Sequence, residues 1–101
     1  MGKIYGYARV STNEQNADRQ LLALEEFGVS PENVFIDHQS GRDFERPQYR
    51  RLLKRLCSDD VLVVKSIDRL GRNYAEILEQ WRIITKEKLA AIVVLDACVI
   101  I

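Results

Sequence analysis

Apolar residues fall into four short runs along the chain. The first run, residues 4–10, alternates between two faces and therefore predicts a β-strand. Residues 34–37, 61–64 and 91–95 predict three more strands. The run at 61–64 is continuously apolar, which is typical of a strand buried on both faces of a parallel sheet.

Helix-like patterns lie between these strands, over residues 13–27, 47–56 and 74–88. Gly28 stands where a helix C-cap is expected, and Pro47 stands at the first position of the second helix. The residue pairs that predict helix starts are Thr12 with Gln15 and Asn73 with Glu76. The predicted buried faces are Ala17, Leu21, Leu24 and Phe27; Tyr49, Leu52, Leu53 and Leu56; and Ile77, Leu78, Trp81 and Ile84.

The element order β-α-β-α-β-α-β predicts an α/β fold. We expect three layers, with a mostly parallel sheet of four or more strands and helices on both faces. The strand order cannot be read from the sequence, but a 2-1-3-4 order would bring the carboxyl ends of the first and third strands side by side at a switch point. A chain of 101 residues is long enough for one domain. The polar segment 38–45 is expected to be a loop.

Charge and cysteine content restrict the class of protein. The 15 basic and 15 acidic residues cancel, so any nucleic-acid site must come from local clustering. Cys57 and Cys98 fit no metal-binding spacing, and we interpret them as reduced core thiols. The chain shows no signal peptide and no apolar stretch near the roughly 20 residues of a membrane helix. We therefore expect a cytoplasmic protein without membrane contact.

Polar residues with suitable chemistry follow the first and third strands. Arg9 and Ser11 end the first strand, and Asp68, Arg69 and Arg72 follow the third. A serine hydroxyl among guanidinium groups suits attack on a phosphodiester, because arginine is always protonated and offers forked donors to phosphoryl oxygens. Ser11 is our candidate nucleophile, and Asp68 would act as a general acid or base, or hold an arginine. Ser11 also fits a simple helix N-cap arrangement, and Asp68 with Arg69 fits a surface ion pair.

Other polar and aromatic residues admit simpler readings. His38, the one histidine, lies in the predicted loop and is interpreted as a solvated side chain. The run 46–55 is basic, and its positions 46, 50 and 54 share one helix face. This face is either solvated or directed at phosphate. Tyr5, Tyr7 and Trp81 are interpreted as core residues.

Several motifs together resemble the catalytic domain of serine recombinases, the resolvase/invertase family of site-specific DNA recombinases. The resemblance extends over about residues 3–95 and implies a resolvase-like fold. The motifs are Tyr7–Thr12, Asp18–Gln20, Ser40–Gly41 with Arg46–Pro47, and Val64–Arg72.

The resemblance implies that Ser11 attacks a DNA phosphodiester, forms a 5′-phosphoserine link and releases a 3′-hydroxyl. Rejoining then needs no ATP, and neither a metal nor another cofactor is implied. DNA is the implied partner, together with self-association into a dimer and an active tetramer. The role of Lys65, which matches a frequent family lysine, stays open. The implied phosphate ligands are Arg9, Arg69, Arg72 and Arg46, with Asp68 near the leaving oxygen and with Gln20 and Tyr7 in support.

Family members continue past the fourth strand with a further strand, a long dimerisation helix and a helix-turn-helix domain. Here residues 1–95 are the predicted catalytic domain and residues 96–101 an atypical tail. We expect weak DNA binding, altered self-association and no strand exchange by this chain alone. One alternative is a non-catalytic remnant that binds or modulates a full-length recombinase. Another is a phosphoesterase acting on small esters, against which the lack of a water-activating histidine and of a metal cluster argues. The DNA site and the type of recombination stay open.

Overall fold

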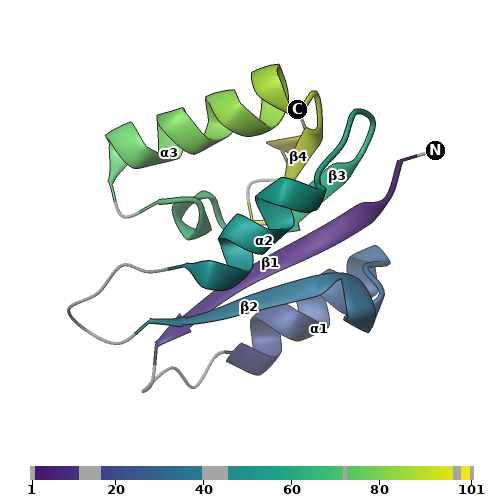
Figure 1. The fold of residues 1–101 in the computed structure, drawn as a ribbon. Coiled ribbons are helices and arrows are strands. Elements are labelled where there is room, and N and C mark those ends of the chain that lie inside the picture. The colour runs from purple at the N-terminus through teal and green to yellow at the C-terminus, as the bar shows by residue number, and fades with distance from the viewer. Residues whose placement is uncertain (1, 12–16, 40–45, 72, 97–98, 101) are drawn as a thin grey trace.

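The computed structural model describes residues 2–11, 17–39, 46–71, 73–96 and 99–100 (Figure 1). The strands are β1 (Ile4–Ser11), β2 (Val34–Gln39), β3 (Val61–Val64), β4 (Ala91–Val94) and β5 (Val99–Ile100). The α-helices are α1 (Ala17–Phe27), α2 (Pro47–Arg55) and α3 (Tyr74–Arg82). Two short 3₁₀ helices, η1 (Pro31–Asn33) and η2 (Ile67–Arg69), and a π-helical turn, η3 (Ile83–Glu87), complete the elements.

The strands form one sheet in the order β2-β1-β3-β4-β5. β1 lies between β2 and β3 and is parallel to both, and β4 is parallel to β3. The predicted α/β fold is therefore confirmed, and its first four strands have the 2-1-3-4 order that places the ends of the first and third strands side by side. The sheet also has a fifth strand, which the sequence did not predict. This strand, β5, pairs antiparallel with the outer side of β4.

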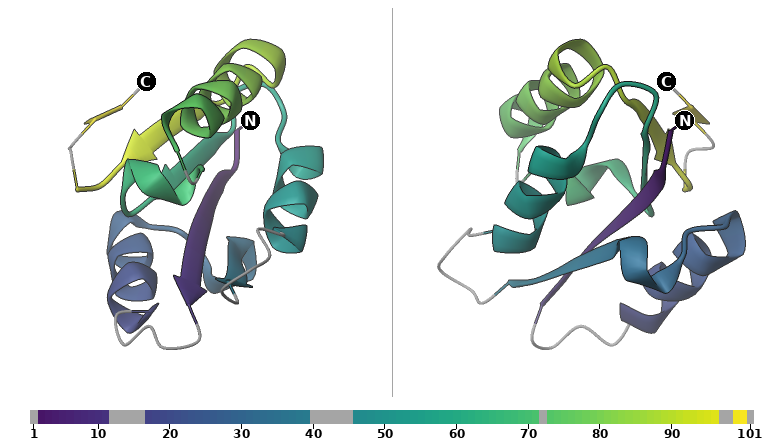
Figure 2. Two further views of the ribbon diagram at one scale, coloured as in Figure 1. Left: turned by 90° about the vertical axis from the view of Figure 1, so that its left-hand side faces the viewer. Right: turned by 45° about the vertical axis from the view of Figure 1, so that its right-hand side comes forward.

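The sheet separates two layers of helix (Figures 1 and 2). α1 packs on one face through Leu24, which lies in a buried cluster with Ala8 and Val63. α2 and α3 cover the opposite face, where Leu52 and Ile84 belong to a second cluster. β3 contributes to both clusters, as the continuously apolar run predicted, and β1 does so too. No helix in the described part of the chain is long and apolar enough to cross a membrane.

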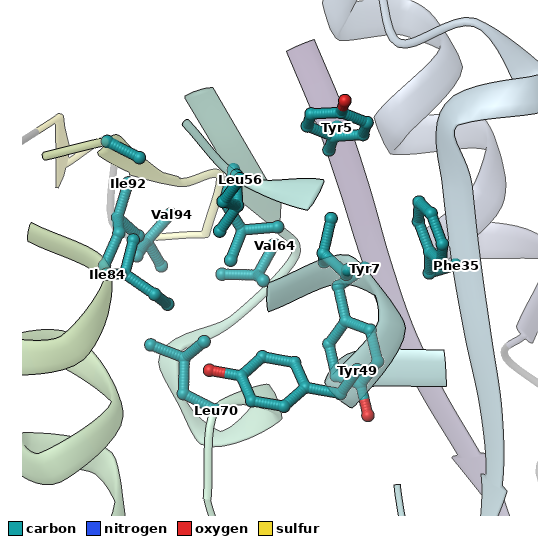
Figure 3. Packing of buried hydrophobic residues seen from close by; sticks show 13 residues of the cluster. Tyr5, Tyr7, Phe35, Tyr49, Leu56, Val64, Leu70, Ile84, Ile92 and Val94 are labelled. Atoms are coloured by element: carbon teal, nitrogen blue, oxygen red, sulfur yellow. The ribbon is translucent and has the colours of Figure 1, made fainter. Parts of the chain in front are cut away.

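Aromatic side chains build much of the cluster beneath α2 (Figure 3). The rings of Tyr7 and Tyr49 lie 5.0 Å apart between centroids, and those of Tyr5 and Phe35 lie 6.1 Å apart. Tyr5 and Tyr7 are buried and Trp81 packs against the same cluster, so the interpretation of these aromatics as core residues is confirmed.

Two residues predicted to be buried are exposed instead. Phe27 is 41% exposed because α1 ends there and Gly28, with φ +117°, turns the chain so that Val29 fills the core position. Leu78 is 51% exposed, because Ile77 and Trp81 already form the side of α3 that faces the core.

Two polar predictions also need correction. His38 lies in β2 and not in a loop, because β1 continues to Ser11 and gives His38 a partner at Val10. Its side chain is exposed, as expected. Cys57 is an exposed free thiol and not a core residue, because it lies just beyond the end of α2. Cys98, the pair Thr12 and Gln15, and residues 40–45 lie outside the described residues.

Candidate active site

Two arginines form hydrogen bonds between the end of β1 and the turn after β3. Arg9 donates from Nη2 to the backbone oxygen of Asp68 at 3.1 Å. Arg69 donates from Nη1 to the backbone oxygen of Arg9 at 2.7 Å. These reciprocal bonds join residues 59 and 60 positions apart in the sequence. The structure thus brings together the predicted ends of the first and third strands, at the carboxyl edge of the sheet.

Positive charge is concentrated around Arg9. This residue is only 9% exposed, and burial is the main cause that lowers the pKa of its guanidinium. The charges of Arg69 and Arg46 lower the pKa further. Arginine remains protonated in proteins, so the cluster stays cationic. An anion placed against it would relieve this repulsion.

Arg46 connects the same region to helix α2. It precedes Pro47 as the N-cap residue of α2 and is 8% exposed. Its Nη1 donates to the backbone oxygen of Leu70 at 2.6 Å, one residue after Arg69. Its guanidinium carbon lies 4.2 Å from the centroid of the Tyr49 ring, a cation–π distance. The start of α2 is therefore attached to the turn that carries Arg69.

Gln20 supports the end of β1 from helix α1. Its Nε2 donates to the backbone oxygen of Arg9 at 3.3 Å, and the residue is 4% exposed. Its Oε1 is buried and has no hydrogen-bond partner among the described residues. The oxygen of Arg9 thus receives donors from two elements, α1 and η2.

Tyr7 lies beneath the site and is fully buried, so it does not face a substrate. Its hydroxyl donates to Oδ2 of Asp37 at 2.9 Å. Burial first, and then the charge of Asp37, raises the pKa of Tyr7 far above its ordinary value. Tyr7 therefore remains a hydrogen-bond donor.

Asp37 is the residue that reasoning from the sequence missed. It is 3% exposed and accepts from the backbone N–H groups of Gln48 at 2.9 Å and Tyr49 at 3.0 Å. A carboxylate at this place caps the positive end of α2. The sequence indicates that α2 needs a cap, because Arg46 at the N-cap position is a poor capping residue, but it does not show which residue supplies that cap.

The comparisons with known proteins identify the family. Residues 4–99 match the resolvase N-terminal domain family. This chain belongs to that family. The transposon Tn3 resolvase of Escherichia coli is 40% identical over 77 residues, which cover 76% of this chain and 42% of that protein. The serine recombinase gin of Escherichia phage Mu is 47% identical over 75 residues, which cover 74% and 38%.

A solved structure agrees with the sequence match. The N-terminal catalytic domain of TP901-1 integrase aligns with a TM-score of 0.75 and 25% identity over 97% of this chain and 80% of that one. The resemblance to serine recombinases that the motifs indicated is thus confirmed, together with the fold. The chain spans about two fifths of the length of the curated relatives named above.

The remaining predicted residues of this resolvase domain are placed in part. The backbone of Ser11 ends β1 opposite Gln39, while the Ser11 side chain and Arg72 lie outside the described part of the structure. The Asp68 carboxylate is exposed, accepts from the Ser66 hydroxyl and lies 3.7 Å from Nε of Arg69. This contact fits both readings of Asp68, a surface ion pair and a carboxylate that holds an arginine.

Lys65, whose role the sequence left open, forms an ion pair with Asp96. The backbone N–H of Asp96 also donates to the oxygen of Lys65 at 2.8 Å. These two contacts join the residues that follow β3 and β4. In this structure Lys65 therefore links the end of β3 to the end of β4.

Proposed function

We propose that this domain cleaves and rejoins DNA with Ser11 as the nucleophile. The serine oxygen attacks the phosphorus of a phosphodiester, and the bond from phosphorus to the 3′ oxygen breaks. The 5′ phosphate remains on the serine, and the 3′ oxygen leaves as a hydroxyl after taking up a proton. The reverse reaction restores the diester, because each step exchanges one phosphate ester for another.

The reciprocal arginine pair is the observation that carries this proposal. Backbone carbonyls orient both Arg9 and Arg69 beside the end of β1, and carbonyls are neutral acceptors. They fix the two guanidinium groups without adding negative charge. Such preorganised charge stabilises the negative charge that develops on phosphoryl oxygens in the transition state. Removing one donor of this kind typically slows a reaction about 10²- to 10³-fold.

The other predicted residues take supporting roles in this proposal. Arg72 and Arg46 add phosphate ligands, and Asp68 lies on the side of the leaving oxygen. Gln20 and Tyr7 act through the elements that they hold, and no metal takes part. DNA is the partner, and self-association into a dimer and tetramer in the cytoplasm follows the family pattern.

A covalent adduct tests the proposal directly. Short duplexes with a randomised centre and a nick would be mixed with the protein, so that the fragment with the released 3′-hydroxyl diffuses away. We expect a protein–DNA adduct on a denaturing gel, with the phosphate mapped to Ser11 by mass spectrometry. Ser11→Ala should abolish the adduct. Ser30→Ala, an exposed serine before η1 whose side chain makes no capping hydrogen bond, is the matched control and should retain it.

Two results would contradict the proposed function. An adduct that persists in Ser11→Ala would remove Ser11 as the nucleophile. Absence of any adduct with the wild-type chain, combined with tight binding to a full-length recombinase, would favour the non-catalytic alternative.

A further inference from the structure

Helix α2 is strongly basic in a chain whose net charge is zero. It contains no acidic residue, and its four cationic side chains are all exposed. None of the four has an ion pair with an acidic side chain in the described part of the chain. The four residues are Arg50, Arg51, Lys54 and Arg55. A solvated helix face does not require this one-sided charge, whereas a polyanion would be attracted to it.

A polar hollow of about 260 Å³ lies between α2 and α3. Arg46, Arg50 and Tyr49 line it from the α2 side, and Gln80 and Glu76 line it from α3. Tyr49 donates its hydroxyl to Oε1 of Gln80 at 2.8 Å. Because this bond occupies the oxygen of Gln80, the amide NH₂ keeps donor capacity for an anion.

Arg46 makes this hollow continuous with the candidate active site. Its guanidinium bonds Leu70, next to Arg69, and the same side chain lines the hollow. Arg50 follows one helical turn later, about 6 Å further along the axis of α2. Lys54 lies one more turn along, on the same helix face. The cationic groups thus extend away from the active site as a line.

We propose that the cleaved DNA strand continues along α2 and that Arg50 and Gln80 bind a neighbouring backbone phosphate in the hollow. This inference rests on the proposed function and assigns the partner of a surface that catalysis does not use. Glu76 lines the same hollow from α3, and Nδ2 of Asn73 donates to its Oε1 at 3.4 Å.

Arg51 provides a matched control for Arg50. Both are exposed arginines in the middle of α2, but Arg51 does not line the hollow. The measurement is fluorescence anisotropy of a short labelled DNA duplex across a salt series, in the Ser11→Ala background so that the DNA stays intact. We expect Arg50→Gln to weaken binding about tenfold at low salt and to lower the slope of log K against log [salt] by about 1. Arg51→Gln should retain the wild-type affinity and slope.

Three outcomes would overturn the inference: equal losses in both variants, an unchanged Arg50→Gln, or no DNA binding by the starting protein. Equal losses would show that α2 attracts DNA non-specifically and that the hollow holds no defined phosphate site. As a direct readout, the Nε–Hε resonance of Arg50 should shift on DNA addition more than that of Arg51. The adduct assay keeps the two proposals separate: a Ser11 adduct in the wild-type chain together with an unchanged affinity of Arg50→Gln overturns this inference and leaves the proposed function intact.

Discussion

At the scale of single residues, backbone oxygens orient two cationic groups of the candidate site, and the Asp68 carboxylate that lies 3.7 Å from Arg69 is exposed. The Arg9 guanidinium lies against a backbone oxygen of η2, and the Arg69 guanidinium lies against a backbone oxygen of β1. A buried carboxylate in either place would form an ion pair and compete with a phosphate. The buried carboxylate nearby, Asp37, is instead occupied by Tyr7 and by the start of α2.

Tyr7→Phe tests how much the hydrogen bond from Tyr7 to Asp37 stabilises the fold. The change removes one of the three donors that the described residues give to a carboxylate that is 3% exposed, so we expect a loss of about 1–3 kcal/mol in the free energy of unfolding at pH 7. Urea denaturation would measure it. Tyr74→Phe, which alters a side chain that is 76% exposed, should change stability by less than about 0.5 kcal/mol. Equal stability of Tyr7→Phe and the wild type would mean that the buried bond contributes nothing.

The raised pKa of Tyr7 also predicts how this contribution depends on pH. In the unfolded chain tyrosine ionises near pH 10, whereas in the folded protein Tyr7 stays protonated well above that pH. The stabilising contribution is thus complete below about pH 10 and declines as the pH rises, by about 1.4 kcal/mol per pH unit. The stability difference between wild type and Tyr7→Phe should therefore shrink between about pH 10 and pH 11. A difference that grows there would contradict the assignment.

At the scale of elements, the ends of helices show what the sequence predicts and what it does not. Pro47 at the start of α2 and Asn73 as the cap of α3 are local signals, and both were predicted correctly. Asp37 lies ten positions before Pro47 and reaches the helix only because β2 ends beside it, so local patterns cannot reveal the cap. Leu89, at φ +57° after η3, ends a helix without the glycine that usually marks such a turn.

Asp37→Ala tests the cap that β2 supplies to α2. Two backbone N–H groups and the Tyr7 hydroxyl lose their acceptor, so we expect a loss of about 2–4 kcal/mol in unfolding free energy. Amide hydrogen exchange of Gln48 and Tyr49 should accelerate about tenfold beyond what this global change explains.

Asn73→Ala is the matched control, because it removes the side-chain oxygen that accepts from the Glu76 N–H. It should accelerate exchange in the first turn of α3 and leave Gln48 and Tyr49 unchanged. Unaltered exchange at those two amides in Asp37→Ala would refute the capping role.

At the scale of the whole molecule, a parallel sheet with helices on both faces was predictable from the element order, whereas the strand order within the sheet was not. The convergence of Arg9, Asp68 and Arg69 followed from that order. β5 was not predictable, because it consists of two residues and depends on pairing with the outer edge of β4. The hydrogen bond from Arg46 to the backbone oxygen of Leu70 was also not predictable, because it depends on how α2 packs on the sheet.

Leu24→Ala tests whether the two faces of this sheet form one cooperative unit. Leu24 is fully buried on the α1 face, while Trp81, the one tryptophan, packs against the cluster on the opposite face. β1 and β3 contribute to both clusters, so loss of packing on one face should destabilise the other. We expect unfolding to cost about 2–5 kcal/mol less than in the wild type, and the Trp81 fluorescence and far-UV circular dichroism transitions to move together. The opposite outcome is a Trp81 fluorescence transition that keeps its wild-type midpoint while the circular dichroism transition moves to a lower denaturant concentration. The α2–α3 layer would then fold independently of the α1 layer. In that case a site assembled from β1, η2 and α2 would not require α1, and the bond from Gln20 to Arg9 would lose its proposed supporting role.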